Sequence, residues 1–207
     1  MTASFYPYIG LTHTIRRQGA KWIVRVSDHF RDAPRVVLEA IAVILACKIA
    51  RRRPPRRSLE TYESYRREPV VTARLLERRR ARGRKVLDTS DGKAHSLSKI
   101  YRELSARWFE DQIEVTRVGW GPRVSWTRLG HWDPAHRTIT ISRALDSPRV
   151  PQCVVAAIVY HEMLHAWLET GADCGPDHPP EFRRIERAYP DFAYAKKFLA
   201  EYCRRRR

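Results

Sequence analysis

The segment His161-Glu162-Met163-Leu164-His165 constrains this chain more than any other stretch of its sequence. Two histidines four positions apart on a helix project about 40° apart around its axis, so both imidazoles face the same point in space. Neutral imidazoles are good ligands for Zn²⁺, and a glutamate beside the first of them is placed to act as a general base on water. The segment therefore predicts a helix that supplies two zinc ligands, His161 and His165, and a catalytic base, Glu162.

The flanking residues predict where this helix begins and ends. Pro148 and Pro151 suit a first turn, Asp146 and Ser147 are candidate caps, and Gly171 is a natural C-terminal stop. The helix between them is apolar enough to be mostly buried. Its histidines and glutamate must then be satisfied, either by a metal or by hydrogen bonds to the backbone and an ion pair with an arginine.

A catalytic zinc site usually has three protein ligands and one open position, so a third ligand is required. Residues 171–182 break the helix, turn the chain and start a new helix at Pro179 or Pro180. His178 lies thirteen residues beyond His165, close enough to fold back onto the first helix, and is the favoured third ligand. Glu181 is its main rival, and the weaker alternatives are Asp173, Cys174 and Asp177.

These residues resemble the SprT-like zinc metallopeptidases. The shared features are the motif His161 to Ala166, then His178-x-x-Glu181-Phe182, and upstream Leu104-x-x-x-Trp108-Phe109, Trp126, Gly130 and Ile139 to Ser142. The resemblance covers about residues 97 to 190, and the ending through Pro190, Lys197 and Leu199 is also similar to the YgjP-like zinc hydrolases. It implies a minimal gluzincin type of fold, with His161, His165 and His178 as ligands and Glu162 as base.

The chain departs from this family in its cysteines. Many SprT-like proteins carry a C-terminal zinc ribbon of paired cysteines. The four cysteines here are scattered singly, which excludes such a ribbon and gives no disulfide framework: Cys47, Cys153, Cys174 and Cys203. With no apolar leader segment and no apolar run long enough to span a bilayer, we expect a cytoplasmic protein without membrane association.

The order of expected elements predicts an α+β fold. Residues 11–17 and 21–27 read as a hairpin, 36–50 as an apolar helix that an Asp32 cap starts, and 51–57 as an extended connector. In the second half, a helix capped by Ser96 or Ser98 precedes strands at 113–118, 124–132 and 137–142 and then the metal helix. We expect a basic N-terminal extension (1–90), a catalytic domain (95–203) with a small three-stranded sheet on the active-site helix, and a basic tail (204–207).

The net charge of +17 is concentrated in two segments of the chain. Residues 51–85 contain 14 Lys and Arg against 4 Glu, and four arginines end the sequence. Such stripes bind polyanions by releasing counterions, although a solvated, solubilising surface has the same composition. The candidate nucleic-acid contacts are Arg51, Arg52, Arg53, Arg56, Arg57, Arg78, Arg79 and Arg80.

The expected function is zinc-dependent peptide hydrolysis with one Zn²⁺ per chain and a protein or peptide substrate. The resemblance together with the charge adds proteins attached to DNA as a substrate class. Tyr189, His131 and Arg143 are candidates for stabilising the oxyanion. Three alternatives stay open: a nucleic-acid-binding protein with a structural zinc, a hydrolase of other substrates, and a protease controlled by its own N-terminal half.

Overall fold

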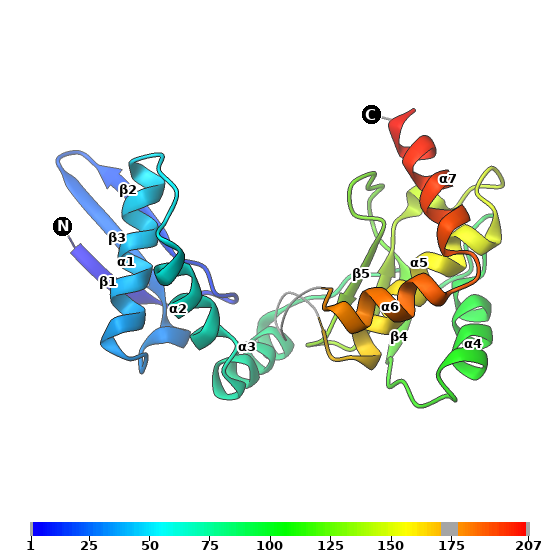
Figure 1. Cartoon of the computed structure of the whole chain (residues 1–207), viewed down its shortest axis with the longest axis horizontal. Coiled ribbons are helices and arrows are strands. Elements are labelled where there is room, and N and C mark those ends of the chain that lie inside the picture. The colour runs from blue at the N-terminus through cyan, green and yellow to red at the C-terminus, as the bar shows by residue number, and fades with distance from the viewer. Residues whose placement is uncertain (1, 171–177, 206–207) are drawn as a thin grey trace. The chain divides into compact units, whose positions relative to one another are not determined.

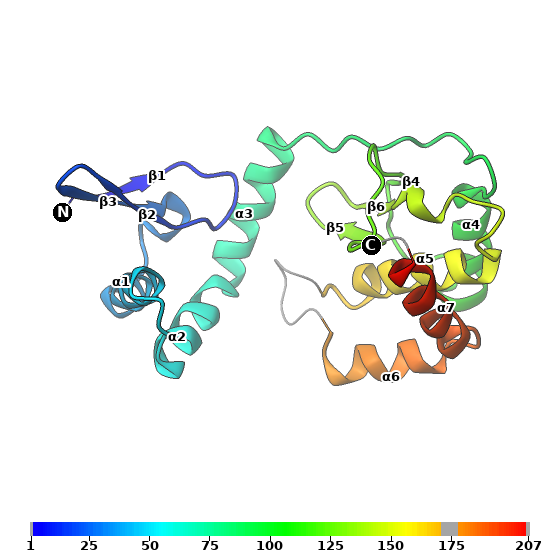
Figure 2. The same ribbon diagram turned by 90° about the horizontal axis from the view of Figure 1, so that it is seen from above.

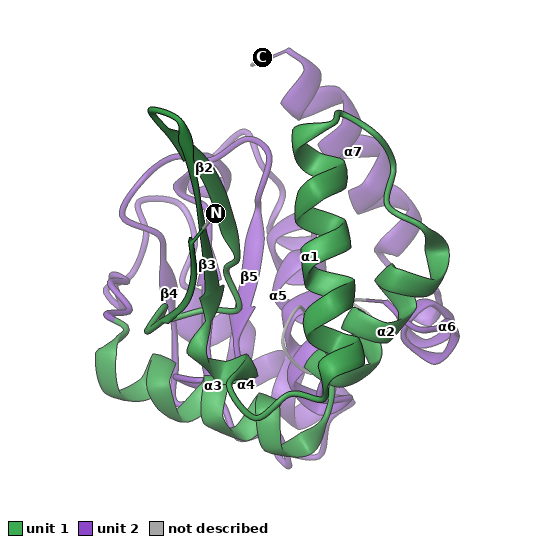
Figure 3. Cartoon of the chain, turned by 90° about the vertical axis from the view of Figure 1, so that its left-hand side faces the viewer, with its two compact units in different colours: residues 1–83 green, residues 84–207 purple. Residues whose placement is uncertain are grey.

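The computed structural model describes residues 2–170 and 178–205. The chain divides into two compact units, residues 1–83 (unit 1) and residues 84–207 (unit 2), which Figure 3 colours separately. Each unit combines a three-stranded mixed sheet with helices, which confirms the α+β fold (Figure 1). Among the described residues, no helix has the length and apolar character needed to cross a bilayer.

The sheet of unit 1 contains the predicted hairpin and one strand more. Strands β2 (Thr14–Gln18) and β3 (Lys21–Ser27) pair antiparallel, and the turn between them contains Gly19 at a φ of +61°. Strand β1 (Thr2–Tyr6), which the sequence did not predict, pairs with β3 in parallel, so the strand order is β1-β3-β2.

Three helices follow in unit 1: α1 (Arg35–Ile49), α2 (Arg56–Arg66) and α3 (Pro69–Arg82). Helix α1 buries Val37, Ile41 and Leu45, spaced four residues apart, in a core that also takes side chains from the sheet. Burying each such side chain contributes about 1.5–3 kcal/mol relative to exposure. The N-cap of α1 is Pro34 and not Asp32, because the Asp32 carboxylate pairs with Arg74 instead.

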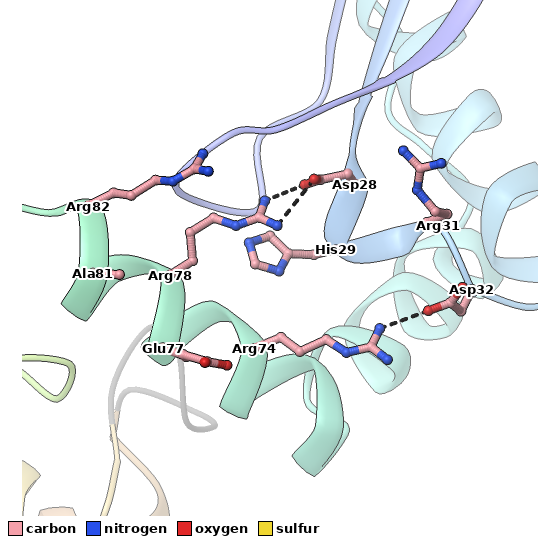
Figure 4. A pocket seen from close by; sticks show the side chains of 9 residues that line it. All are labelled: Asp28, His29, Arg31, Asp32, Arg74, Glu77, Arg78, Ala81 and Arg82. Atoms are coloured by element: carbon pink, nitrogen blue, oxygen red, sulfur yellow. Dashed lines mark hydrogen bonds and ion pairs between the residues drawn. The ribbon is translucent and has the colours of Figure 1, made fainter.

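Arginines of α3 hold this helix against the short helix η1 (Asp28–Phe30) and the loop before β2 (Figure 4). Both terminal nitrogens of Arg78 donate to the Asp28 carboxylate, and Nη1 also donates to the Tyr8 carbonyl at 3.0 Å. Arg74 donates to Asp32 at 2.9 Å. These groups line a pocket of about 470 Å³ in which most charges are neutralised by a partner within the pocket.

Unit 2 begins with α4 (Leu97–Trp108), and Ser96 caps it as predicted, its hydroxyl accepting from the Lys99 amide. The strands are β4 (Arg117–Trp120), β5 (Gly130–Asp133) and β6 (Thr138–Ile141), in the order β4-β6-β5. They are shorter than predicted: residues 113–116 and 124–129 are irregular. The Ser125 amide, for example, bonds to the Ser142 hydroxyl instead of a strand neighbour.

Helix α5 (Gln152–Trp167) is the central element of unit 2, in contact with the sheet and with α4, α6 (Pro180–Ala188) and α7 (Phe192–Arg204) (Figures 1 and 2). Because neighbours surround it, it is apolar on most sides rather than along one stripe. Pro151 is its N-cap, whereas the Asp146 carboxylate accepts instead from the amides of Lys93 and Ala94. The helix ends at Trp167, and the predicted stop at Gly171 lies outside the described residues.

Candidate metal centre

Three histidines from two parts of unit 2 meet at one point. His161 and His165 lie one turn apart on α5, and His178 lies just before α6. One nitrogen of each ring lies within 4.8 Å of the others, so the three can hold a metal ion. The Nε2 atoms of His161 and His178 are 3.2 Å apart, close to the spacing of about 3.3 Å between two nitrogens on a tetrahedral zinc ion.

The second nitrogen of each α5 histidine has a hydrogen-bond partner. His161 Nδ1 donates to the Glu186 carboxylate at 2.6 Å, and His165 Nδ1 is hydrogen-bonded to the Thr170 hydroxyl at 2.9 Å. His161 Nε2 is thereby left with a lone pair that faces the cluster, and a hydroxyl at His165 Nδ1 is compatible with the same tautomer, the arrangement found around metal-bound histidines. The donor set therefore fits a metal ion.

The electrostatics of His165 suit a ligand as well. Burial lowers its pKa, and the neighbouring charges of His161 and His178 lower it further, to about 3. His165 is therefore neutral over the physiological range, and a neutral imidazole is the form that binds a metal.

Phe182 of α6 sets the position of all three rings. This fully buried side chain lies 5.1 Å from the His161 ring, 4.6 Å from His165 and 4.8 Å from His178, measured between centroids. Packing against one rigid ring restricts the rotamers of three ligands at once. The Glu-Phe pair at the start of α6 thus contributes Phe182 as a packing residue.

Of the proposed third ligands, the structure brings His178 into the cluster. Glu181 is exposed on the first turn of α6 and is not part of the cluster. Asp173, Cys174 and Asp177 lie outside the described residues.

Glu162 lies beside the cluster, buried between α5 and strand β5. Its side chain is only 5% exposed and accepts a hydrogen bond from the Trp132 backbone amide. Burial raises the pKa of this carboxyl to about 7, although His161, Arg128 and Lys85 partly oppose the shift. A carboxyl group with a pKa near neutrality is suited to accept and return a proton.

Strand β5 leaves room for this carboxylate because residue 130 is a glycine. A Cβ at Gly130 would overlap the Oε1, Cδ and Cγ atoms of Glu162. In the sequence, Gly130 stands out only through the family resemblance. Glu186, Thr170 and Gly130 are the site residues that spacing alone did not find, because each reaches the motif through tertiary packing.

The three candidates for oxyanion stabilisation differ in their surroundings. His131 of β5 is near enough to the cluster that its charge contributes to the lowered pKa of His165. Arg143 pairs with Asp88. The Tyr189 ring stacks on Tyr160 at 4.3 Å, and burial raises its pKa to about 12.

The candidate nucleic-acid arginines are all in unit 1, in two separate stretches of the sequence. Arg51 to Arg53 are exposed between α1 and α2, and Arg56 and Arg57 begin α2, where Arg56 pairs with Glu60. Arg78, on α3, is held by Asp28, and Arg79 and Arg80 follow it. Arg78 is therefore engaged in the fold of unit 1.

Comparison with known proteins gives no further guide to the site. Neither a protein-family model, nor a curated protein, nor a solved structure gives a significant match to this chain.

Proposed function

We propose that the chain is a zinc-dependent metallopeptidase in which His161, His165 and His178 hold the metal and Glu162 is the general base. The observation that carries this proposal is the buried carboxyl group of Glu162, which lies near enough to His161 of the three-histidine cluster that the charge of this ring acts on its pKa. A structural zinc site has no use for a base, whereas hydrolysis of an unactivated carbonyl requires one.

Zinc at this site would polarise the substrate carbonyl and acidify water. Glu162 would accept the proton of the attacking water and then deliver it to the leaving amine. One side chain would thus act first as general base and then as general acid. The pKa of about 7 suits both transfers. His131, on the strand that borders the site, is the preferred group for stabilising the oxyanion.

Strand β5 supports a peptide as the substrate. It is an edge strand of the β4-β6-β5 sheet, and it contacts α5. An edge strand presents backbone amides and carbonyls to which an extended peptide can add as a further strand, and on β5 the Trp132 amide already donates to Glu162. A peptide bound there would run past Glu162 and the histidines.

The direct test compares the wild-type protein with Glu162→Gln, both purified and loaded with one equivalent of zinc. Wild-type protein should hydrolyse an unstructured protein such as casein, and the variant should lose turnover by at least about 10³-fold while it retains one zinc per chain. Glu181→Gln, a matched change at an exposed position, should leave turnover unaltered. Equal turnover of wild type and a zinc-loaded Glu162→Gln protein would rule out this role.

The alternative function, a nucleic-acid-binding protein with a structural zinc, predicts a different result. Both wild type and Glu162→Gln would bind zinc, and neither would hydrolyse a substrate. A closed structural site also needs a fourth protein ligand, and the described residues contribute three histidines.

We further propose DNA-associated proteins as the substrate class. The support is the resemblance to SprT-like peptidases and the excess of positive charge. Proteolysis of a DNA-bound protein should rise when single- or double-stranded DNA is added at low salt, and the absence of any stimulation would contradict this assignment.

A further inference from the structure

The charge of the chain is distributed unequally between its two units. Unit 1 has 19 Lys and Arg against 7 Asp and Glu, a net charge of +12 in 83 residues, whereas unit 2 has 21 against 16. Polyanion binding by this chain is therefore expected in unit 1, and the question is which of its surfaces would make the contact.

One face of the unit 1 sheet is covered and the other is not. Phe5, Ile15, Val24 and Val26 pack against the core that α1 contributes to. Because side chains alternate along a strand, the residues between them point to the opposite face. No described element of residues 2–83 covers that opposite face, and Figure 2 shows α1 and α2 on the other side of the strands.

The strand register identifies the side chains of the uncovered face. Ser4, Arg25 and Thr14 form one row across β1, β3 and β2, and Thr2, Ile23 and Arg16 form the next. Lys21 and Gln18 form a third row at the hairpin end. Tyr6 and Ser27 form the row at the other end, where Ser27 is buried and its hydroxyl donates to the Gly10 carbonyl. We call the rest of this surface the outer sheet face; its residues are Thr2, Ser4, Tyr6, Thr14, Arg16, Gln18, Lys21, Ile23 and Arg25.

The outer sheet face carries positive charge without any acidic neighbour in its own strands. Residues 1–27 contain no Asp or Glu. Arg16 and Lys21 are exposed, and neither has an ion-pair partner among the described residues. Arg25 stacks over the ring of Tyr6, 4.7 Å from its centroid, which leaves its charge uncompensated.

The chemistry of this face selects duplex DNA among polyanions. The β2-β3 hairpin that carries most of this face is a two-stranded ribbon, which a major groove about 12 Å wide admits. Hydroxyl and amide side chains between the cations can donate to base edges and phosphates. Single strands are bound mainly by stacking on several aromatic rings, whereas this surface has one, Tyr6, and Arg25 already stacks on its ring. The major groove of duplex RNA is too narrow for side chains to read.

The pocket beneath α3 is a weaker candidate for the same ligand. Its arginines face Asp28, Asp32 and Glu77, and Arg78 and Arg74 already pair with two of these carboxylates (Figure 4). The exposed arginines 51–53 are a second alternative, and they serve as the control below.

We propose that the outer sheet face of unit 1 binds duplex DNA, with Arg16, Lys21 and Arg25 on its phosphates. This site lies in the extension outside the region that resembles SprT-like peptidases. Its test measures binding alone, so it can fail while the proposed hydrolysis succeeds, and the reverse.

The experiment measures binding of a fluorescein-labelled 20-base-pair DNA to the full chain by anisotropy at several salt concentrations. The sheet variant is Arg16→Gln/Lys21→Gln/Arg25→Gln, and the matched control is Arg51→Gln/Arg52→Gln/Arg53→Gln, which removes the same charge from the same unit. The sheet variant should bind at least about tenfold more weakly, and the slope of log K against log salt should fall by about 3. The control should change binding by less than about threefold.

Two further variants separate a loss of DNA contacts from a folding defect of the triple sheet variant. Arg16→Gln/Lys21→Gln leaves the Arg25–Tyr6 contact in place and should lower the slope by about 2. Arg16→Lys/Arg25→Lys conserves the charge and should retain binding.

Other outcomes would overturn the proposal. Equal weakening by both triple variants would mean that binding depends on net charge alone, and loss only in the control would assign the contact to residues 51–53. Preference for single-stranded DNA or duplex RNA of the same length, or no binding at low salt, would exclude duplex DNA at this face.

Discussion

At the scale of single residues, the choice of third ligand follows from where each side chain points. His178 places its Nε2 3.2 Å from that of His161, whereas Glu181 is exposed on the first turn of α6. We predict that His178→Ala lowers zinc affinity by at least about 100-fold, since two imidazoles remain, and that Glu181→Ala leaves it unchanged. Elemental mass spectrometry measures the zinc content of both variants after dialysis against a competing chelator. A larger loss in Glu181→Ala would make the glutamate the ligand.

His13 of unit 1 is a residue whose protonation opposes folding. Burial lowers its pKa to about 4, and its Nδ1 accepts the Ser27 amide at 3.2 Å, so the folded state needs the neutral ring. The folded pKa lies below the unfolded value of about 6.5, so this contribution is complete above pH 6.5 and is lost as the pH falls toward 4. We predict that the free energy of unfolding of unit 1 falls by about 2–3 kcal/mol between pH 7.5 and pH 4.5 through the protonation of His13 alone.

The variant His13→Phe isolates this effect, because it keeps ring contacts with Phe30 and Tyr62 but cannot be protonated. Trp22 is the only tryptophan in residues 1–83, so urea unfolding followed by ¹⁹F NMR of 5-fluorotryptophan reports on unit 1 within the full chain. The free energy of unfolding should depend less steeply on pH in His13→Phe. The same dependence in both proteins would assign the acid sensitivity to other groups.

At the scale of elements, α5 and β5 form the site by close approach. A Cβ at position 130 would overlap the Glu162 carboxylate, so Gly130→Ala must displace this side chain. We predict that turnover falls by about 10²-fold, the cost of misplacing a catalytic group by about 1 Å, while zinc content is kept. Gly121→Ala is the matched control, because its nearest new contact, Thr140 Cγ2 at 3.4 Å, is ordinary packing. Equal turnover of Gly130→Ala and wild type would show that β5 does not constrain Glu162.

The same pair of elements shows what sequence alone can and cannot predict. The positions of His161, Glu162 and His165 follow from helical periodicity, which is local, and α5 is found where its apolar pattern predicts it. Its cap was predicted wrongly, because the Asp146 side chain satisfies amides of residues 93 and 94, far from it in sequence. The strands were predicted too long for a related reason: apolar residues in 124–129 pack in loops as well as in strands.

At the scale of the whole molecule, pairings between distant segments decide the two sheets. The parallel pairing of β1 with β3 brings the first residues of the chain beside residues 23–27, and a five-residue segment is too short for periodicity to predict it. The contacts of Glu186 with His161 and of Phe182 with all three histidines likewise depend on how α6 docks on α5. The sequence thus predicted three histidines that could hold a metal ion, and the structure adds the groups that orient them.

Because every described ligand belongs to unit 2, metal removal should act on one part of the chain. Helix α6 has only nine residues and a polar sequence, so it is marginal without tertiary contacts, and these run through Phe182 and Glu186 to the ligand histidines. A ligand at 100 times its Kd stabilises the state that binds it by about 2.7 kcal/mol.

We predict that chelation raises the hydrogen-exchange rate of α6 amides at least about tenfold and that of α1 amides less than twofold, with zinc but not calcium restoring protection. Hydrogen exchange by mass spectrometry measures both helices in one experiment. Unaltered exchange in α6 would show that the histidine cluster gains nothing from a metal, and an equal rise in α1 would show that its effect is not confined to unit 2.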